Sequence, residues 1–471
     1  MAPIRPKLAL PFALALSAAP LAAATLIVDT DQDSAATDGF CSLREAIAAA
    51  NTDAPFGDCP AGSGPDRIVF ALPTPATLLL AASLPQIEET LRIQGPGATL
   101  LTLDGQNLWG LLAFEDPFGD GWLGVDGLTL ARGVSSGYGG GALVEVGETT
   151  LFRDVIFLEN RAANGGGGLA ARDLSDVRIE GCWFSGNVAE GPTGGGGLMV
   201  DDAVAIVIER STFSDNAASH ENGSGGGLKI LRTPATLRAS TVSANWSNGG
   251  GGGIQVYAAP SPASLALFDS TVTGNRADED GTGSSDDGGG IDFFLDAGSS
   301  ATFAIGNSIV AENEDSGATL APDLYLPVEV SLSNYGFNLI GDNAGASTDF
   351  PAGSPNAADD YVGTTAAPID PRLGALAAWG GATPSHRPLL SPLSRALDSG
   401  SCAGAGGDQR GYGDAVARAR AFDLDTVANG AGSDGCDIGA HERGADPGAD
   451  PALFADGFEA GHTLIWSLET P

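Results

Sequence analysis

Charged residues at matched positions of a repeated pattern are the strongest candidates for chemistry in this 471-residue chain. Glycine runs lead into Leu169, Leu198 and Leu228, and five charged residues follow three or four positions later: Arg172, Asp173, Asp201, Asp202 and Arg232. Carboxylates gathered beside a cation in one groove could cleave a polysaccharide by general acid–base chemistry. The interpretation that we favour is a self-neutralising patch of ion pairs, since such networks are common without catalysis.

Acidic loops are the other candidates for a site. Asp280, Asp286 and Asp287 lie in an insert and are candidate calcium ligands, because Ca²⁺ binds carboxylate oxygens. Residues 29–33 (DTDQD) resemble the start of a calcium loop, but Ser34 replaces the required glycine. None of the four histidines has a nearby Cys or His partner for zinc. We expect both loops to be solvated and predict no cofactor other than calcium.

An internal repeat of about 29 residues positions the charged residues. Between Val125 and Asn313 one unit recurs: a glycine run, an aliphatic residue, a variable strand, and an apolar residue followed three positions later by asparagine. Where the run leads into Leu143, this alignment puts Val146 and Gly147 in the charged positions. The repeated asparagines are Asn160, Asn187, Asn216, Asn245, Asn275 and Asn313.

The repeat predicts an all-β fold, a parallel β-helix. Its segments are short alternating runs of Val, Ile, Thr and Phe without helical periodicity, which indicates strands. About 29 residues accommodate three short strands and three turns, whereas propeller blades need about 40 to 45 residues. We expect each repeated asparagine to adopt the left-handed backbone conformation at a corner and to stack its amide in a ladder.

The N-terminus indicates export. Arg5 and Lys7 precede an apolar run at 8–21 and three alanines, the layout of a cleavable secretory signal, so we expect the mature chain to begin near Thr25. No later segment of 18 apolar residues exists, and we predict no transmembrane segment after signal removal. Export permits disulfides, for which Cys41 with Cys59 and Cys402 with Cys436 are candidates, whereas Cys182 lies in an apolar strand.

A cap is expected at the N-terminal end of the stack. Ser42 and Glu45 form a capping-box pattern, and an amphipathic helix should run from there through Ala50.

The charge of the whole chain limits its partners. With 59 acidic against 22 basic residues the net charge is −37, which excludes binding to nucleic acid or to an anionic membrane surface through a basic face.

Motifs along the chain resemble three known families. Residues 41–51 (CSLREAIAAAN) match the signature of the CSLREA-domain family of exported bacterial proteins. Residues 93–98 and the glycine and Phe-x-x-Asn units are similar to the polymorphic outer-membrane protein type of β-helix, and residues 307–313, 336–341, 370–374 and 436–442 resemble the choice-of-anchor Q domain. The resemblance implies a right-handed parallel β-helix, exported and often attached to the cell surface, with no established reaction.

This organisation divides the chain into five expected parts: a signal peptide at 1–24, an N-terminal cap at 25–65, the β-helix at 66–313, a choice-of-anchor Q-like part of the helix and cap at 314–442, and a linker with a C-terminal tail at 443–471. The function we expect is adhesion, or binding of a glycan or a surface protein, without catalysis. A polysaccharide lyase or glycoside hydrolase using the acidic groove and a structural spacer are the alternatives.

Overall fold

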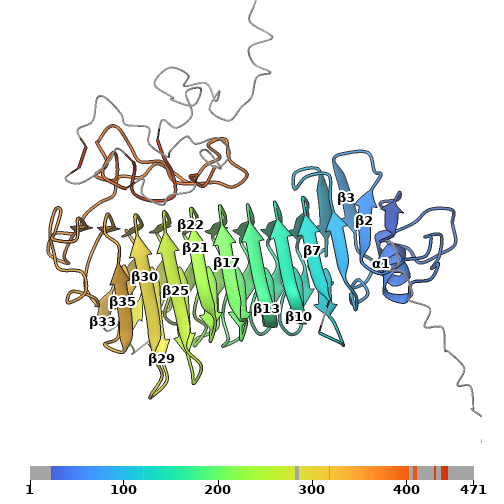
Figure 1. Cartoon of the computed structure of the whole chain (residues 1–471), viewed down its shortest axis with the longest axis horizontal. Coiled ribbons are helices and arrows are strands. Elements are labelled where there is room, and N and C mark those ends of the chain that lie inside the picture. The colour runs from blue at the N-terminus through green and yellow to red at the C-terminus, as the bar shows by residue number, and fades with distance from the viewer. Residues whose placement is uncertain are drawn as a thin grey trace, which may run out of the picture.

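The protein forms a parallel β-helix, whose long axis is horizontal in Figure 1. The computed structural model describes residues 23–119, 121–281, 286–317, 319–401, 407–410, 429–430 and 436–443. Within these ranges every pairing between two named strands is parallel, and most join one coil to the next. This confirms the all-β solenoid that the repeat predicts. No helix in the described ranges is long and apolar enough to cross a membrane.

Three sheets run along the solenoid, and the largest, sheet A, has 17 strands. Most coils contribute two strands to sheet A, which merge into one long strand in two coils. The strands of sheet A are β1 (Thr25–Val28), β2 (Asp66–Phe70), β4 (Leu91–Gln94), β6 (Leu112–Glu115), β7 (Trp122–Asp126), β10 (Ala142–Arg153), β13 (Leu169–Glu180), β16 (Leu198–Asp201), β17 (Ala205–Glu209), β20 (Leu228–Leu231), β21 (Pro234–Arg238), β24 (Ile254–Ala258), β25 (Ala263–Phe268), β29 (Ile291–Leu295), β30 (Ala301–Gly306), β34 (Leu324–Tyr325) and β35 (Val330–Asn334).

Sheets B and C complete each coil with shorter strands. Sheet B has 11 strands: β3 (Ala76–Leu79), β5 (Leu101–Asp104), β8 (Thr129–Ala131), β11 (Ile156–Leu158), β14 (Trp183–Ser185), β18 (Thr212–Ser214), β22 (Thr241–Ser243), β26 (Thr271–Thr273), β31 (Ile309–Ala311), β36 (Leu339–Ile340) and β37 (Tyr361–Val362). Sheet C has seven: β9 (Val134–Ser135), β12 (Arg161–Ala162), β15 (Val188–Ala189), β19 (Ala217–Ala218), β23 (Trp246–Ser247), β27 (Arg276–Ala277) and β32 (Glu314–Asp315). A separate pair is formed by β28 (Asp286–Gly288) and β33 (Thr319–Ala321).

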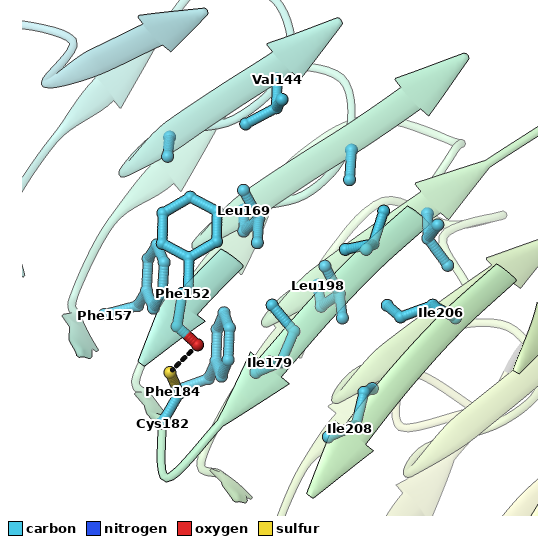
Figure 2. Packing of buried hydrophobic residues seen from close by; sticks show 14 of the residues in the cluster. Val144, Phe152, Phe157, Leu169, Ile179, Cys182, Phe184, Leu198, Ile206 and Ile208 are labelled. Atoms are coloured by element: carbon cyan, nitrogen blue, oxygen red, sulfur yellow. Dashed lines mark hydrogen bonds between the residues drawn. The ribbon is translucent and has the colours of Figure 1, made fainter. Parts of the chain in front are cut away.

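The core is built from columns of identical or similar apolar side chains. Strand residues alternate between the inside and the outside of the coil, so parallel in-register pairing stacks each inward residue on its counterpart. On sheet B, the rings of Phe157, Phe184 and Phe213 stack with centroids 4.4 and 4.5 Å apart. Figure 2 shows Phe157 and Phe184 beside Cys182, whose buried thiol donates to the main-chain oxygen of Phe152 at 3.4 Å.

The repeated asparagines form a continuous buried ladder along the solenoid. The Nδ2 group of each asparagine from Asn160 to Asn275 donates to Oδ1 of the next at 2.8 to 2.9 Å. Their backbone differs from our expectation, because the left-handed conformation lies one residue earlier, for example at Glu159 (φ 53°), Asp215 (φ 58°) and Ala244 (φ 56°). The preceding residue makes the corner, which leaves the asparagine side chain pointing inward to bond its neighbours.

A helix covers the N-terminal end of the stack. Helix α1 (Leu43–Thr52) packs against β1 and β2, and its capping box is complete: Ser42 accepts from the N–H of Glu45, and Glu45 accepts from the N–H of Ser42. The Cys41–Cys59 disulfide holds the adjoining loop, which confirms that predicted bridge. The first part of the chain, through residue 22, lies outside the described residues.

The described part of residues 372–443, here called the return segment, runs back along the outside of sheet B (Figure 1, orange to red). Gln409 accepts from the hydroxyl of Thr241 at 2.6 Å and donates to that of Thr212 at 2.7 Å. His386 contacts Ser243 at 2.8 Å, and the N–H of Ala440 donates to Thr271. Outward side chains of sheet B are therefore buried by polar contacts.

Two predictions for the C-terminal region fall wholly or partly outside the described residues. Cys436 is disulfide-bonded, but Cys402, its expected partner, lies outside them. The tail after Arg443 lies outside as well.

Candidate binding face on sheet A

The five charged residues predicted from sequence lie together on the outer face of sheet A, where the first and second strand segments of each coil meet. Arg172 on β13 is in register with Asp201 on β16. The chain turns at the next residue of each coil. Asp173 (φ 54°), Asp202 (φ 53°) and Arg232 (φ 49°) occupy this turn and all have the left-handed backbone conformation. Parallel pairing of three successive coils thus brings all five residues together at this junction, as the repeat alignment predicts.

Arg232 links the two aspartates of the preceding coil. Its Nη2 contacts Oδ1 of Asp201, and its Nε donates to Oδ2 of Asp202 at 3.0 Å. One guanidinium therefore holds both carboxylates in a fixed geometry, which a planar fork of donors favours. Burial raises the pKa of the Asp201 carboxyl, the positive charge of Arg232 opposes that rise, and the negative charge of Asp202 adds to it.

Arg172 has different partners, which the sequence alignment missed. Its Nη1 donates to Oε1 of Glu145 at 2.6 Å, and its guanidinium lies 4.7 Å from the ring centroid of Tyr138. The structure pairs Ala142, rather than Leu143, with Leu169, so Glu145 is the true counterpart of Arg172. The predicted alignment of Val146 was wrong by one residue, because the small Ala142 takes the inward position that a larger aliphatic residue fills in later coils.

A row of buried polar side chains lies beside these residues, and sequence analysis did not find it. Lys229, Gln255 and Asp292 occupy one register position on β20, β24 and β29. The Lys229 ammonium contacts Oε1 of Gln255, and Gln255 Nε2 donates to Asp292 Oδ2 at 2.7 Å. The sequence pattern that could have revealed this row is the polar residue one position after the aliphatic residue of each of these coils. Earlier coils have the apolar Ala170 and Met199 at that position.

Aromatic residues continue the face towards the C-terminal coils. Tyr257 and Phe294 follow Asp201 along the same register column, with ring centroids 5.5 Å apart. The Lys229 ammonium lies 5.7 Å from the Tyr257 ring centroid, within cation–π range. Next to Phe294 a cleft of about 330 Å³ is lined by Asp296, Tyr325 and Glu329, among others. We call the outer surface from Arg172 to Glu329 the binding face.

The acidic residues predicted as calcium ligands do not form a metal site among the described residues. Among the described residues no group of three or more His, Cys, Asp or Glu side chains is arranged to hold a metal ion. Asp280 is exposed, and the side chains of Asp286 and Asp287 lie outside what the structure describes, so calcium there stays a prediction. In the N-terminal loop, Asp33 is engaged by Arg44 through two hydrogen bonds of 2.8 and 2.6 Å.

A second cleft of about 820 Å³ lies between β37 and the return segment. Tyr361, Asp370, Arg372 and Arg395 are among its lining residues. Its lining includes Gly430, which adjoins stretches outside the described residues on both sides.

Comparison with known proteins places most of the binding face within a recognised fold. Residues 134–321 match the family model of the right handed beta helix region. The fold is therefore a right-handed parallel β-helix, and the matched range contains Arg172, Asp201 and Arg232. No curated protein and no solved structure matches the chain significantly.

Proposed function

We propose that this protein is an exported β-helix protein that binds a glycan along the binding face without cleaving it. The observation that carries the proposal is the engagement of the charged groups: Arg232 holds both Asp201 and Asp202, and Glu145 holds Arg172. A general acid and base must exchange protons with the substrate, whereas these groups are fixed by one another. Fixed polar groups beside exposed aromatic rings suit recognition of sugar hydroxyls and ring faces.

The remaining features of the chain fit this proposal. The Cys41–Cys59 disulfide is expected in an oxidising, exported environment, in line with the predicted signal and the resemblance to CSLREA-domain proteins. The net charge of −37 disfavours polyanionic ligands, so the glycan is expected to be neutral or cationic.

The test is a glycan-array screen of the mature protein, paired with an assay for cleavage of polysaccharides. We expect binding that weakens in Arg172→Ala and no release of new chain ends. Failure to bind any glycan would contradict the proposal and favour a structural spacer. Cleavage that disappears in Asp201→Asn would also contradict it.

A polysaccharide lyase or glycoside hydrolase is the second candidate. The observation that favours it is the raised pKa of the Asp201 carboxyl, since a general acid needs a carboxyl that stays protonated at higher pH than usual. The cleavage assay above separates the two functions.

A further inference from the structure

The C-terminal end of the binding face has a small cleft of distinctive chemistry. The cleft of about 330 Å³ lies where β29 ends and the chain turns through Asp296 to Ser299, and its other wall comes from Tyr325, Pro327 and Glu329. We call it the amine cleft. It is continuous with the binding face, because Phe294, which lines it, follows Tyr257 in register.

Aromatic rings give the amine cleft one kind of attraction. The Phe294 side chain is 47% exposed, although large apolar side chains are usually buried. Its ring lies 5.5 Å from that of Tyr257, and the other neighbour of Tyr257 is the ammonium of Lys229, 5.7 Å from the ring centroid. The same aromatic cluster thus already packs against one ammonium group of the protein itself.

Two carboxylates give the amine cleft the complementary charge. Asp296 and Glu329 are both exposed, and within the described residues neither forms an ion pair with lysine or arginine. The Tyr257 hydroxyl donates to Asp296 Oδ1 at 3.1 Å, which fixes that carboxylate beside the rings. This differs from the Asp201 end of the face, where Arg232 forms ion pairs with both Asp201 and Asp202.

Together the aromatic rings and the two carboxylates favour a ligand that has a positive charge next to an apolar surface. A cation gains from both the ring faces and the carboxylates, and a sugar ring presents C–H groups that can pack against an exposed aromatic ring. We propose that the amine cleft binds the free ammonium group of an amino sugar at one end of the bound glycan. This inference rests on the proposed function and specifies its ligand class.

The experiment compares two oligosaccharides of equal length, an oligomer of glucosamine and the corresponding oligomer of N-acetylglucosamine, by calorimetric titration of the mature protein. We expect the glucosamine oligomer to bind at least about tenfold more tightly. In Asp296→Asn, and separately in Glu329→Gln, its affinity should fall by about threefold to thirtyfold, while binding of the acetylated oligomer should stay the same. Phe294→Ala should weaken binding of both oligomers, and that of the glucosamine oligomer more strongly, because the ring contacts sugar C–H groups as well as the ammonium group.

A matched control is Phe118→Ala, which removes another exposed ring, 89% accessible, and should leave both affinities unchanged. Each variant alters an exposed side chain, and its melting temperature should equal that of the native protein. The two hypotheses fail differently. Equal affinity for both oligomers would overturn the amine cleft but leave glycan binding intact, whereas binding of neither would overturn the proposed function. A lysine-rich peptide that binds the cleft when no glycan does would overturn the amino-sugar assignment.

Discussion

Asp323 takes the place of the next asparagine at the C-terminal end of the ladder. Its Oδ1 accepts hydrogen bonds from Nδ2 of Asn313 at 2.9 Å and from the main-chain N–H of Asn313 at 3.1 Å. Its Oδ2 accepts from the N–H of Asp342 at 2.6 Å, and the side chain is buried. The final acceptor of the ladder is therefore an ionisable group.

The first prediction follows from the titration of this residue. Burial raises the pKa of Asp323 from 3.8 to about 7, despite the hydrogen bonds that lower it. A pKa raised on folding gives a stabilising contribution that is complete below the unfolded pKa and is lost as pH rises through the folded pKa. The last coils should therefore lose stability between about pH 4 and pH 8 relative to Asp323→Asn, in which no group titrates at this position.

Hydrogen exchange of amides in β34 to β36, measured across this pH range, checks that prediction. Local exchange is preferable to a single melting temperature, because neighbouring coils of a solenoid need not unfold together. An identical pH dependence in the native protein and in Asp323→Asn would show that the carboxyl does not titrate in this way.

The second prediction concerns the phenylalanine stack. Phe184 is buried between the rings of Phe157 and Phe213, so Phe184→Ala should remove contacts on both sides and leave a cavity. We expect a loss of about 3–5 kcal/mol in the free energy of unfolding, measured by denaturant titration. The exposed Phe118→Ala is the control, and a similar loss there would contradict the assignment.

The third prediction is a stabilising substitution at a buried hydroxyl. Thr150 on β10 is fully buried, is in register with Val177, and its hydroxyl has no hydrogen-bond partner among the described residues. Thr150→Val keeps the shape and removes an unsatisfied polar group, so the free energy of unfolding should rise by about 1 kcal/mol. Thr149→Val, at the adjacent and partly exposed position, should have little effect. A destabilised Thr150→Val protein would indicate that the hydroxyl is bonded.

The fourth prediction is that Cys182 is chemically inert in the folded protein. Burial raises the pKa of its thiol to about 12, and the thiolate is the reactive form. A thiol-specific reagent at pH 8 should label the protein in denaturant and leave the native protein unlabelled, as read by mass spectrometry. Rapid labelling of the native state would mean that the core opens readily around Phe152.

Local sequence signals were sufficient for the parts of the structure that repeat. The Ser42–Glu45 capping box and the asparagine ladder could be predicted because each depends on short spacings that every coil or helix turn reuses. The alignment of Glu145 with Arg172 could not, because Ala142 breaks the pattern of larger inward residues and only the backbone register reveals the shift.

Contacts between residues far apart in the sequence could not be predicted from the repeat. Thr212 bonds Pro384, 172 residues away, and nothing in the spacing of either residue indicates their meeting. The row of Lys229, Gln255 and Asp292 was missed for a different reason. The predicted charged residues lie three and four residues after the aliphatic residue of each coil, whereas this row lies one residue after it.

The course of the return segment determines from which point the molecule could be held. Arg443, the last described residue, donates to the carbonyl of Pro388, two residues beyond His386 and its contact with Ser243 near the middle of the stack. A force applied to the solenoid through the return segment would therefore enter from its side rather than from an end. The hydrogen bonds of Gln409 with Thr212 on β18 and Thr241 on β22 would carry part of that force.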